Sequence, residues 1–170
     1  PKHIDSLVKH GLQAIEAGSY ALGLSLLDRT THLIGKHPAA VTLRLLSDGL
    51  RIGLERFSEV VDLALPDLPL SDKQRGQFLQ YKGWGLVMTG QAAAAQPYFE
   101  QALQLMHCTP PSTEYLYLQN IYALSQFRQG KRERAMQFER AIALSLKLQS
   151  APSPHLIYLN SMNTARLLLS

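Results

Sequence analysis

The apolar residues of this chain recur three and four positions apart along almost its whole length, which is the spacing of amphipathic helices. In the first stretch Leu7, Leu12 and Ile15 fall on one such stripe, and similar stripes follow to the end of the chain. Alternation at every second residue is rare, and no Asn-Gly or Asp-Gly pair separates two alternating runs. The pattern therefore predicts an all-α protein.

Glycines, prolines and capping residues divide this pattern into about nine helices. Ser71 with Gln74 three residues later has the spacing of a capping box, so a helix is expected to begin there. Pro38 and Pro154 suit the first position of a helix, where the missing N–H costs nothing. Helices are expected to stop at Gly18, Gly35, Pro66, Gly90 and Gly130.

Three glycine-punctuated stretches of the chain can be laid on one another. Small residues recur where two helices must approach closely, large apolar residues where a side chain fills the gap, and a glycine where the first helix turns. The third copy has lost one residue after its turn glycine. The copies are Gly11, Ala14, Gly18, Gly23, Leu27 and Thr30; Gly83, Leu86, Gly90, Ala95, Phe99 and Ala102; and Ala123, Gly130, Ala135, Phe138 and Ala141.

A more degenerate copy is expected between the first and the second, with Gly53 or Glu55 near its turn. Taking Gly53, the distance between successive turn glycines grows along the chain, from 35 residues to 37 and then 40. The unit of the protein is therefore expected to be a helical hairpin.

These hairpins resemble the tetratricopeptide repeat (TPR), most closely from Leu79 to Leu105, with departures at Leu79 and His107. The matches cover most of residues 4–148. Because the strict period is about 34 residues, the array resembles the looser, longer-period variety of bacterial multidomain proteins. The resemblance implies one domain over residues 1–170, with about four hairpins and a terminal helix wound into a right-handed superhelix, an α-solenoid.

In this family the first helices of the hairpins line a concave groove that takes extended peptides. Trp84, the only tryptophan, is a residue type that anchors peptides, but it could equally pack between hairpins. Asn120 could hold a peptide backbone through its amide or be an ordinary solvated residue. The resemblance places Val87 and Leu124 in the groove together with seven residues that are the candidates for partner binding: Gln77, Gln80, Trp84, Met88, Tyr117, Asn120 and Phe127.

The clamp with which chaperone-binding members hold a C-terminal carboxylate is absent, because Val8, Leu12, Gln80 and Trp84 occupy its faces. No catalytic constellation is found either. His32 and His37 are five residues apart, off the spacing of two ligands on one helix face. We therefore expect no enzyme, no cofactor and no metal.

Charge and cysteine content narrow the partners further. The net charge is +4, and basic residues gather between Arg128 and Arg140, interrupted by Glu133 and Glu139. We interpret this cluster as a solvated helix face rather than a nucleic-acid site. The lone Cys108 favours a reducing compartment, and neither a membrane span nor a signal peptide is recognised, so we expect a cytoplasmic protein.

The sequence thus predicts a protein-protein interaction scaffold that binds a peptide, a partner domain or another domain of the same chain. The alternative is an effector-sensing or regulatory segment of a multidomain bacterial transcription regulator or enzyme. The chain starts at Pro1 and stops at Ser170 inside an apolar pattern, so a fragment of a larger protein is expected. Its last helix is expected to pack on Lys131–Leu148 and to leave an apolar strip free, which would support a truncation-driven dimer.

Overall fold

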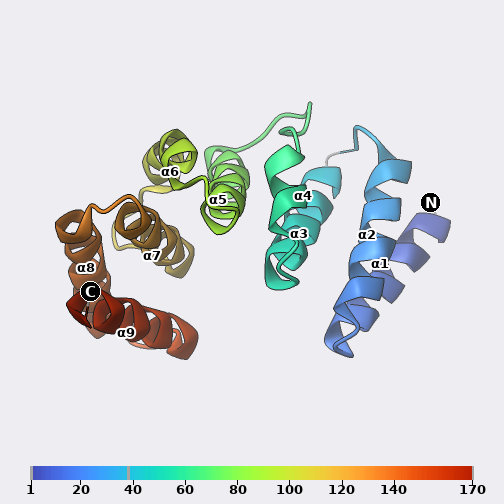
Figure 1. Ribbon diagram of the computed structural model, residues 1–170. Coiled ribbons are helices and arrows are strands. Elements are labelled where there is room, and N and C mark those ends of the chain that lie inside the picture. The colour runs from blue at the N-terminus through green and yellow to red at the C-terminus, as the bar shows by residue number, and fades with distance from the viewer. Residues whose placement is uncertain (1, 38, 170) are drawn as a thin grey trace.

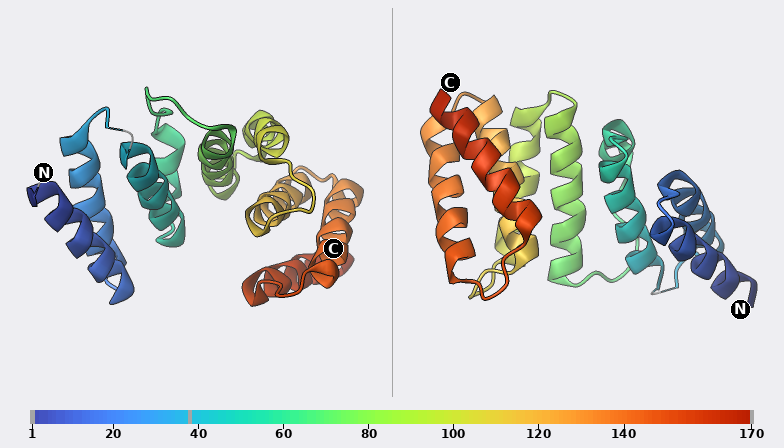
Figure 2. Two further views of the ribbon diagram at one scale, coloured as in Figure 1. Left: turned by 180° about the vertical axis from the view of Figure 1, so that it is seen from behind. Right: turned by 90° about the horizontal axis from the view of Figure 1, so that it is seen from below.

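The computed structural model describes residues 2–37 and 39–169, and throughout these ranges it is all-helical, as predicted (Figure 1). The helices lie in a curved row with the two ends of the chain at opposite ends of the row (Figures 1 and 2). Three residues named in the sequence analysis lie outside the described ranges. They are Pro1 and Ser170, at the two ends of the sequence, and Pro38, at which the third helix is expected to begin. The nine helices of the described part are α1 (Lys2–Glu16), α2 (Tyr20–Ile34), α3 (Ala39–Gly53), α4 (Phe57–Asp62), α5 (Asp72–Met88), α6 (Ala92–Met106), α7 (Thr113–Arg128), α8 (Arg132–Leu148) and α9 (Pro154–Leu169).

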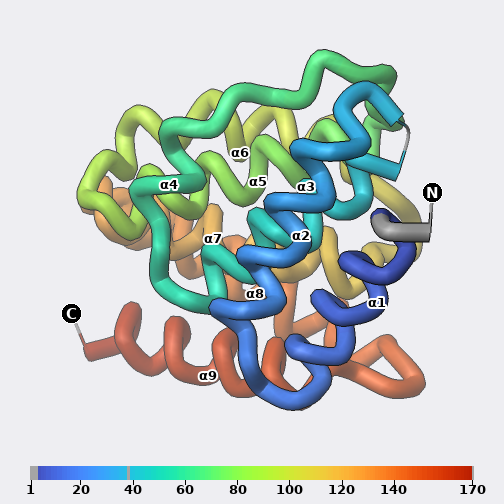
Figure 3. Tube along the Cα trace, turned by 90° about the vertical axis from the view of Figure 1, so that its right-hand side faces the viewer, coloured from blue at the N-terminus to red at the C-terminus, as the bar shows by residue number. Residues whose placement is uncertain are grey.

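Consecutive helices pack in pairs, and each pair packs on the next. The second helix of a pair contacts the first helix of the following pair throughout, from α2 against α3 to α8 against α9. First helices also contact one another from α3 onward, α3 with α5, α5 with α7 and α7 with α9. Within the described ranges α1 is different, because it contacts α2 alone. Figure 3 looks along the row from the end that carries this first pair.

The hairpin turns repeat one hydrogen-bonding geometry. Gly18 has a φ of +77°, its N–H donates to the carbonyl of Ile15 at 2.9 Å, and the Ser19 N–H donates to the carbonyl of Ala14 at 2.7 Å. These two bonds form a Schellman motif, which satisfies carbonyls that the helix end would otherwise leave open. Gly90 and Gly130 repeat both bonds at φ values of +84° and +74°. The turns that the repeat alignment places in the three copies therefore share one structure.

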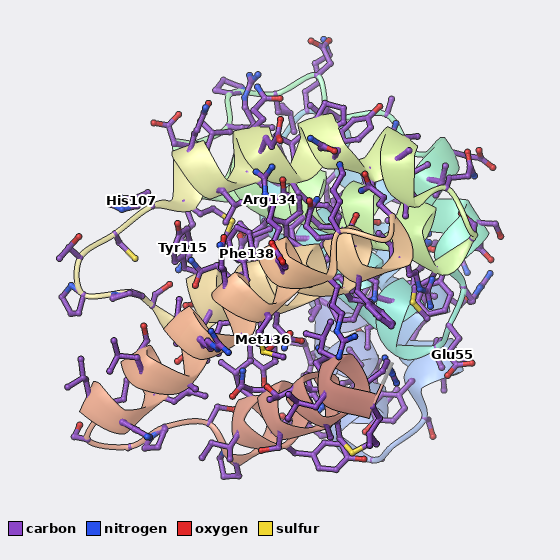
Figure 4. All side chains as sticks on the ribbon, turned by 60° about the vertical axis from the view of Figure 1, so that its left-hand side comes forward. Glu55, His107, Tyr115, Arg134, Met136 and Phe138 are labelled. Atoms are coloured by element: carbon purple, nitrogen blue, oxygen red, sulfur yellow. The ribbon has the colours of Figure 1, made fainter. Side chains whose placement is uncertain are left out.

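The second pair makes the same turn without a glycine. Glu55 has a φ of +59°, its N–H donates to Ile52 at 3.0 Å, and the Arg56 N–H donates to Arg51 at 2.8 Å (Figure 4). The turn residue is therefore Glu55 and not Gly53. With turns at residues 18, 55, 90 and 130, the spacing is 37, 35 and 40 residues, so the prediction of a steadily growing period is wrong.

Replacing Glu55 with glycine is expected to raise the free energy of unfolding by about 1 kcal/mol, because glycine adopts a positive φ without the steric cost borne by other residues. Urea denaturation followed by circular dichroism measures the change. Glu55→Ala is the matched control, since alanine removes the charge and keeps the cost. A gain of equal size in Glu55→Ala would trace the effect to the carboxylate and contradict this account.

The small positions of the repeat lie where helices of one pair approach most closely. A Cβ added to Gly11 would lie 3.2 Å from Leu27 Cδ2, and one added to Gly83 would lie 2.9 Å from Phe99 Cε1. Both pairs of residues are 16 positions apart in the sequence. The alignment of the first two copies is thus matched by equivalent packing, in which the backbone of the first helix lies against a large apolar side chain of the second.

Helix ends follow local chemistry. Ser71 and Gln74 form the expected capping box, with the Gln74 N–H donating to Ser71 Oγ at 3.3 Å and the Ser71 N–H donating to Gln74 Oε1 at 3.0 Å. Helix α4 ends at Asp62, earlier than the expected stop at Pro66. The ring of Pro66 clashes with a helical carbonyl four residues before it, and the residue preceding a proline avoids helical angles, so the helix ends a turn ahead.

An ion-pair network joins α2, α3 and α4. Arg51, which is almost completely buried, donates to Asp28 of α2 at 2.6 Å, to Asp48 of its own helix at 3.0 Å and to Glu59 of α4 at 3.4 Å. Arg44 also pairs with Asp48. Burial raises the pKa of Asp48, while the two guanidinium groups act in the opposite direction. Because Arg51 has a carboxylate partner on each of three helices, it holds the first two pairs together.

Helix α9 packs on α7 and α8, as expected for its contact with α8. Its apolar stripe is only partly covered, because Ile157, Tyr158, Met162 and Leu168 are more than two fifths exposed. The dimer expected from such a strip stays a prediction. Within the described ranges, none of the helices combines the length and apolar character that crossing a membrane requires.

Candidate functional site: a groove between α5, α7 and α9

A groove of about 350 Å³ opens between three first helices, α5, α7 and α9. Its lining combines apolar, aromatic and cationic side chains and includes no aspartate or glutamate. A concave site with a largely apolar wall and a few polar groups is the usual form of a binding site. The lining residues are Trp84, Met88, Tyr117, Asn120, Ile121, Leu124, Arg128, Tyr158, Leu159, Met162, Asn163 and Arg166.

Four of the seven residues proposed for partner binding line this groove, namely Trp84, Met88, Tyr117 and Asn120. The other three do not. Gln80 is 6% exposed, and Gln77 is half-buried away from the groove. Phe127 lines a narrow cavity between α7 and α9 together with Glu139 and Arg166. Of the remaining positions implied by the resemblance, Leu124 lines the groove and Val87 is fully buried in the core.

Trp84 takes both of the places considered for it. Its ring is half-buried and packs against the core cluster formed by α5, α6 and α7, and it also lines the groove. The groove wall at this point is therefore an extension of the core. A side chain fixed in this way loses little conformational entropy when a ligand packs on it.

Tyr117 fixes the beginning of α9 against α7. Its hydroxyl lies 3.1 Å from Ser153 Oγ and 2.9 Å from His155 Nδ1, and its ring lies 5.8 Å from the His155 ring between centroids. Ser153 also caps α9, since its Oγ accepts the Leu156 N–H at 3.4 Å. The expected start of this helix at Pro154 is confirmed, and the same residues position one wall of the groove.

Two arginines bring positive charge to the groove. Arg128, at the end of α7, donates to the Val87 carbonyl in the last turn of α5, where helix carbonyls favour a cation. The side chain of Arg166 in α9 makes no hydrogen bond or ion pair with any other described residue. Neither guanidinium has a carboxylate partner among the described residues, whereas Arg44, Arg51 and Arg56 all do.

A buried glutamate lies behind the groove where α7, α8 and α9 meet. Glu139 is 1% exposed, and its carboxylate accepts hydrogen bonds from three asparagines. Asn120 donates to both oxygens at 3.2 Å, Asn160 to Oε2 at 2.7 Å and Asn163 to Oε1 at 3.0 Å. Asn160 also donates to the Glu139 backbone carbonyl at 2.8 Å. This set of amides attaches α9 to the two helices beneath it.

The Glu139 carboxyl has no cationic partner among the described residues, so burial dominates its ionisation. Burial raises its pKa from 4.5 to about 7, and the amide donors of Asn160, Asn163 and Asn120 oppose that change by favouring the ionised form. Asn120 therefore has a partner within the protein. Of the two roles considered for it, an ordinary solvated residue does not describe its position, because Asn120 is buried, and peptide binding through its amide stays a prediction.

The basic cluster seen in the sequence is divided in the structure. Arg128 lines the groove, whereas Arg132 and Arg140 of α8 line shallow depressions elsewhere. Arg134 extends over the Tyr122 ring, 5.9 Å from its centroid, and donates to its hydroxyl at 3.3 Å. The cations of α8 therefore line depressions other than the groove, although Arg132 donates to the Leu168 carbonyl at the end of α9.

Sequence reasoning missed the contribution of α9, because that helix was treated as an unpaired end. A signal was present. Asn160 follows Asn120 by 40 residues, the same step that separates Gly90 from Gly130. Extending the repeat by one more first helix would have brought this helix to the groove, although the 40-residue step maps Tyr117 and Leu124 onto Ile157 and Thr164 and not onto the α9 residues that line it. The sequence offered no comparable signal for Glu139, because nothing in it distinguishes this glutamate from the other charged residues of the same helix.

Comparison with known proteins adds no family assignment. Among the described residues, no group of histidine, cysteine, aspartate and glutamate side chains is arranged to hold a metal ion. No protein-family model matches the chain, and neither a curated protein nor a solved structure matches it.

Proposed function

We propose that this chain is a TPR-type interaction module, a right-handed α-solenoid that binds a peptide or a segment of a partner domain in the groove between α5, α7 and α9, without catalysing a reaction. The observation that carries the proposal is the groove itself, which is lined by first helices and has Trp84 in its wall. The repeated turn and packing geometry supports the TPR-type architecture.

The side chains of the groove suit a peptide. Tyr158 is 59% exposed and Met162 is 45% exposed, so apolar surface is open to solvent beside the half-buried Trp84. Aromatic side chains supply large contact areas at low entropic cost, and methionines adapt to ligands of different shape. Together these residues can hold apolar side chains of an extended segment.

The test is selection from a library of random peptides displayed on phage, followed by titration of the selected peptides. Since Trp84 is the only tryptophan, its intrinsic fluorescence reports directly on occupancy of the groove. Replacing Tyr158 with alanine is expected to weaken binding about ten-fold, because a central aromatic contact contributes about 1–2 kcal/mol.

Tyr20→Ala is the matched control. Tyr20 is a similarly exposed tyrosine, 48% exposed on α2 and outside the groove. Its loss is expected to leave peptide affinity unchanged. If the library yields no binders, or if binders neither change Trp84 fluorescence nor distinguish the two variants, the proposed function is wrong.

A further inference from the structure

We infer that the ligand of this groove is an acidic peptide segment, in which carboxylates pair with Arg128 and Arg166 while neighbouring apolar side chains pack on Trp84, Tyr158 and Met162. The inference rests on the proposed function and names the chemistry of its partner. It follows from three features of the groove: its charge, the unused hydrogen-bond donors of its arginines, and the arrangement of its apolar side chains.

The side chains that line the groove carry a net positive charge. Arg128 and Arg166 are its two cations, and no carboxylate is among its lining residues. The acidic group behind the lining is Glu139, which is 1% exposed and accepts hydrogen bonds from the amides of Asn120 and Asn163. A carboxylate that enters the groove therefore meets two guanidinium groups and no competing exposed anion.

The arginines also have unused donors. A guanidinium carries five N–H donors in a planar fork that matches a carboxylate. Arg166 uses none of them on another described residue, and Arg128 uses only its contact with the Val87 carbonyl, which holds its side chain across the groove. Both arginines are exposed, so these donors are open to a ligand. The groove arginines are arranged to receive anions from outside.

Apolar surface lies between and beside these cations. Met88, Tyr158 and Met162 are each more than a third exposed, so a ligand must present apolar groups as well as charge. Two cations are few for a nucleic acid, whose affinity comes from many phosphate contacts. The cations of α8 line other depressions and add none to the lining of the groove. An acidic segment with interspersed large apolar residues matches both components of the groove.

The test is to pan a random dodecapeptide phage library against the wild-type chain and against an Arg166→Gln variant, with a random RNA pool panned in parallel. The side chain of Arg166 makes no hydrogen bond or ion pair with another described residue, so its replacement is expected to leave the fold intact. Wild-type binders are expected to be enriched in Asp and Glu near Leu, Phe or Trp. Loss of one charge-assisted contact is expected to weaken these binders about ten-fold in Arg166→Gln.

Arg140→Gln is the matched control, because Arg140 is exposed on α8 outside the groove. It should bind the selected peptides as the wild type does. Binders that change Trp84 fluorescence but are not acidic, or that bind Arg166→Gln equally well, would overturn the inference and leave the proposed function standing. A failure to select any peptide would contradict both the inference and the proposed function. Enrichment of RNA whose binding weakens in Arg140→Gln would replace the acidic peptide by a nucleic acid.

Discussion

The free energy of unfolding is expected to fall by about 3 kcal/mol as the pH rises from 4.5 to 7, because Glu139 has a raised pKa only in the folded chain. Its pKa is about 7 when folded and near 4.5 when unfolded. Between these values the folded state holds a proton that the unfolded state has released, so a higher pH favours unfolding. The contribution is fully present below pH 4.5 and is lost above pH 7.

The measurement is urea denaturation at several pH values between 4.5 and 8. Glu139→Gln removes the titrating group and is expected to flatten the dependence, apart from the part that the raised pKa of Asp48 contributes with the same sign. Glu133→Gln, an exposed change on the same helix, should keep the full slope. A slope that survives unchanged in Glu139→Gln would show that another group is responsible.

Replacing Gly83 with valine is expected to lower the free energy of unfolding by about 3 kcal/mol through overpacking. The new Cβ would lie 2.9 Å from both Cε1 and Cζ of Phe99, and that ring is completely buried against Tyr122 with centroids 5.6 Å apart. The ring therefore cannot move aside without displacing α7.

Gly53→Val is the control for helix propensity, since Gly53 ends α3, is exposed and has nothing within 4 Å of an added Cβ. Its stability should change by less than about 1 kcal/mol. Adding Phe99→Leu to Gly83→Val should recover part of the loss, because the first copy of the repeat pairs its glycine with Leu27. Equal stability of Gly83→Val and Gly53→Val in urea would refute the packing argument.

The fold could be predicted where local chemistry decides it. Gly18, Gly90 and Gly130 were expected at helix ends because glycine adopts a positive φ at little steric cost, and each has a positive φ in the structure. The capping box at Ser71 predicted a helix start, which is also confirmed. Glu55 could not be distinguished from Gly53, because both lie near the expected turn and a positive φ is uncommon at a glutamate and ordinary at a glycine. Helix α4 is short because the Pro66 ring would clash with a helical carbonyl in the turn before it.

The groove was accessible to prediction only in part. The resemblance to the TPR, carried onto the repeat alignment, selected Trp84, Met88 and Tyr117 as groove residues, and each of them lines the groove. Periodicity itself identifies only which face of a helix is apolar. Periodicity does not tell which polar side chains are buried with partners. Gln80 and Asn120 occupy equivalent positions 40 residues apart, yet only Asn120 meets a glutamate from the next helix. Such pairings depend on neighbouring hairpins and are visible only in three dimensions.

The isolated packing of α1 makes the N-terminal end the weak end of a one-dimensional array. In such arrays each unit is stabilised by its nearest neighbours, and opening begins where that coupling is smallest. Among the described residues α1 contacts α2 only, and Arg51 supplies the ionic tie between α2 and the third helix. Amide hydrogen exchange should therefore be fastest across the first hairpin and slowest in α7, so the chain can fray by a whole hairpin while the groove keeps its shape.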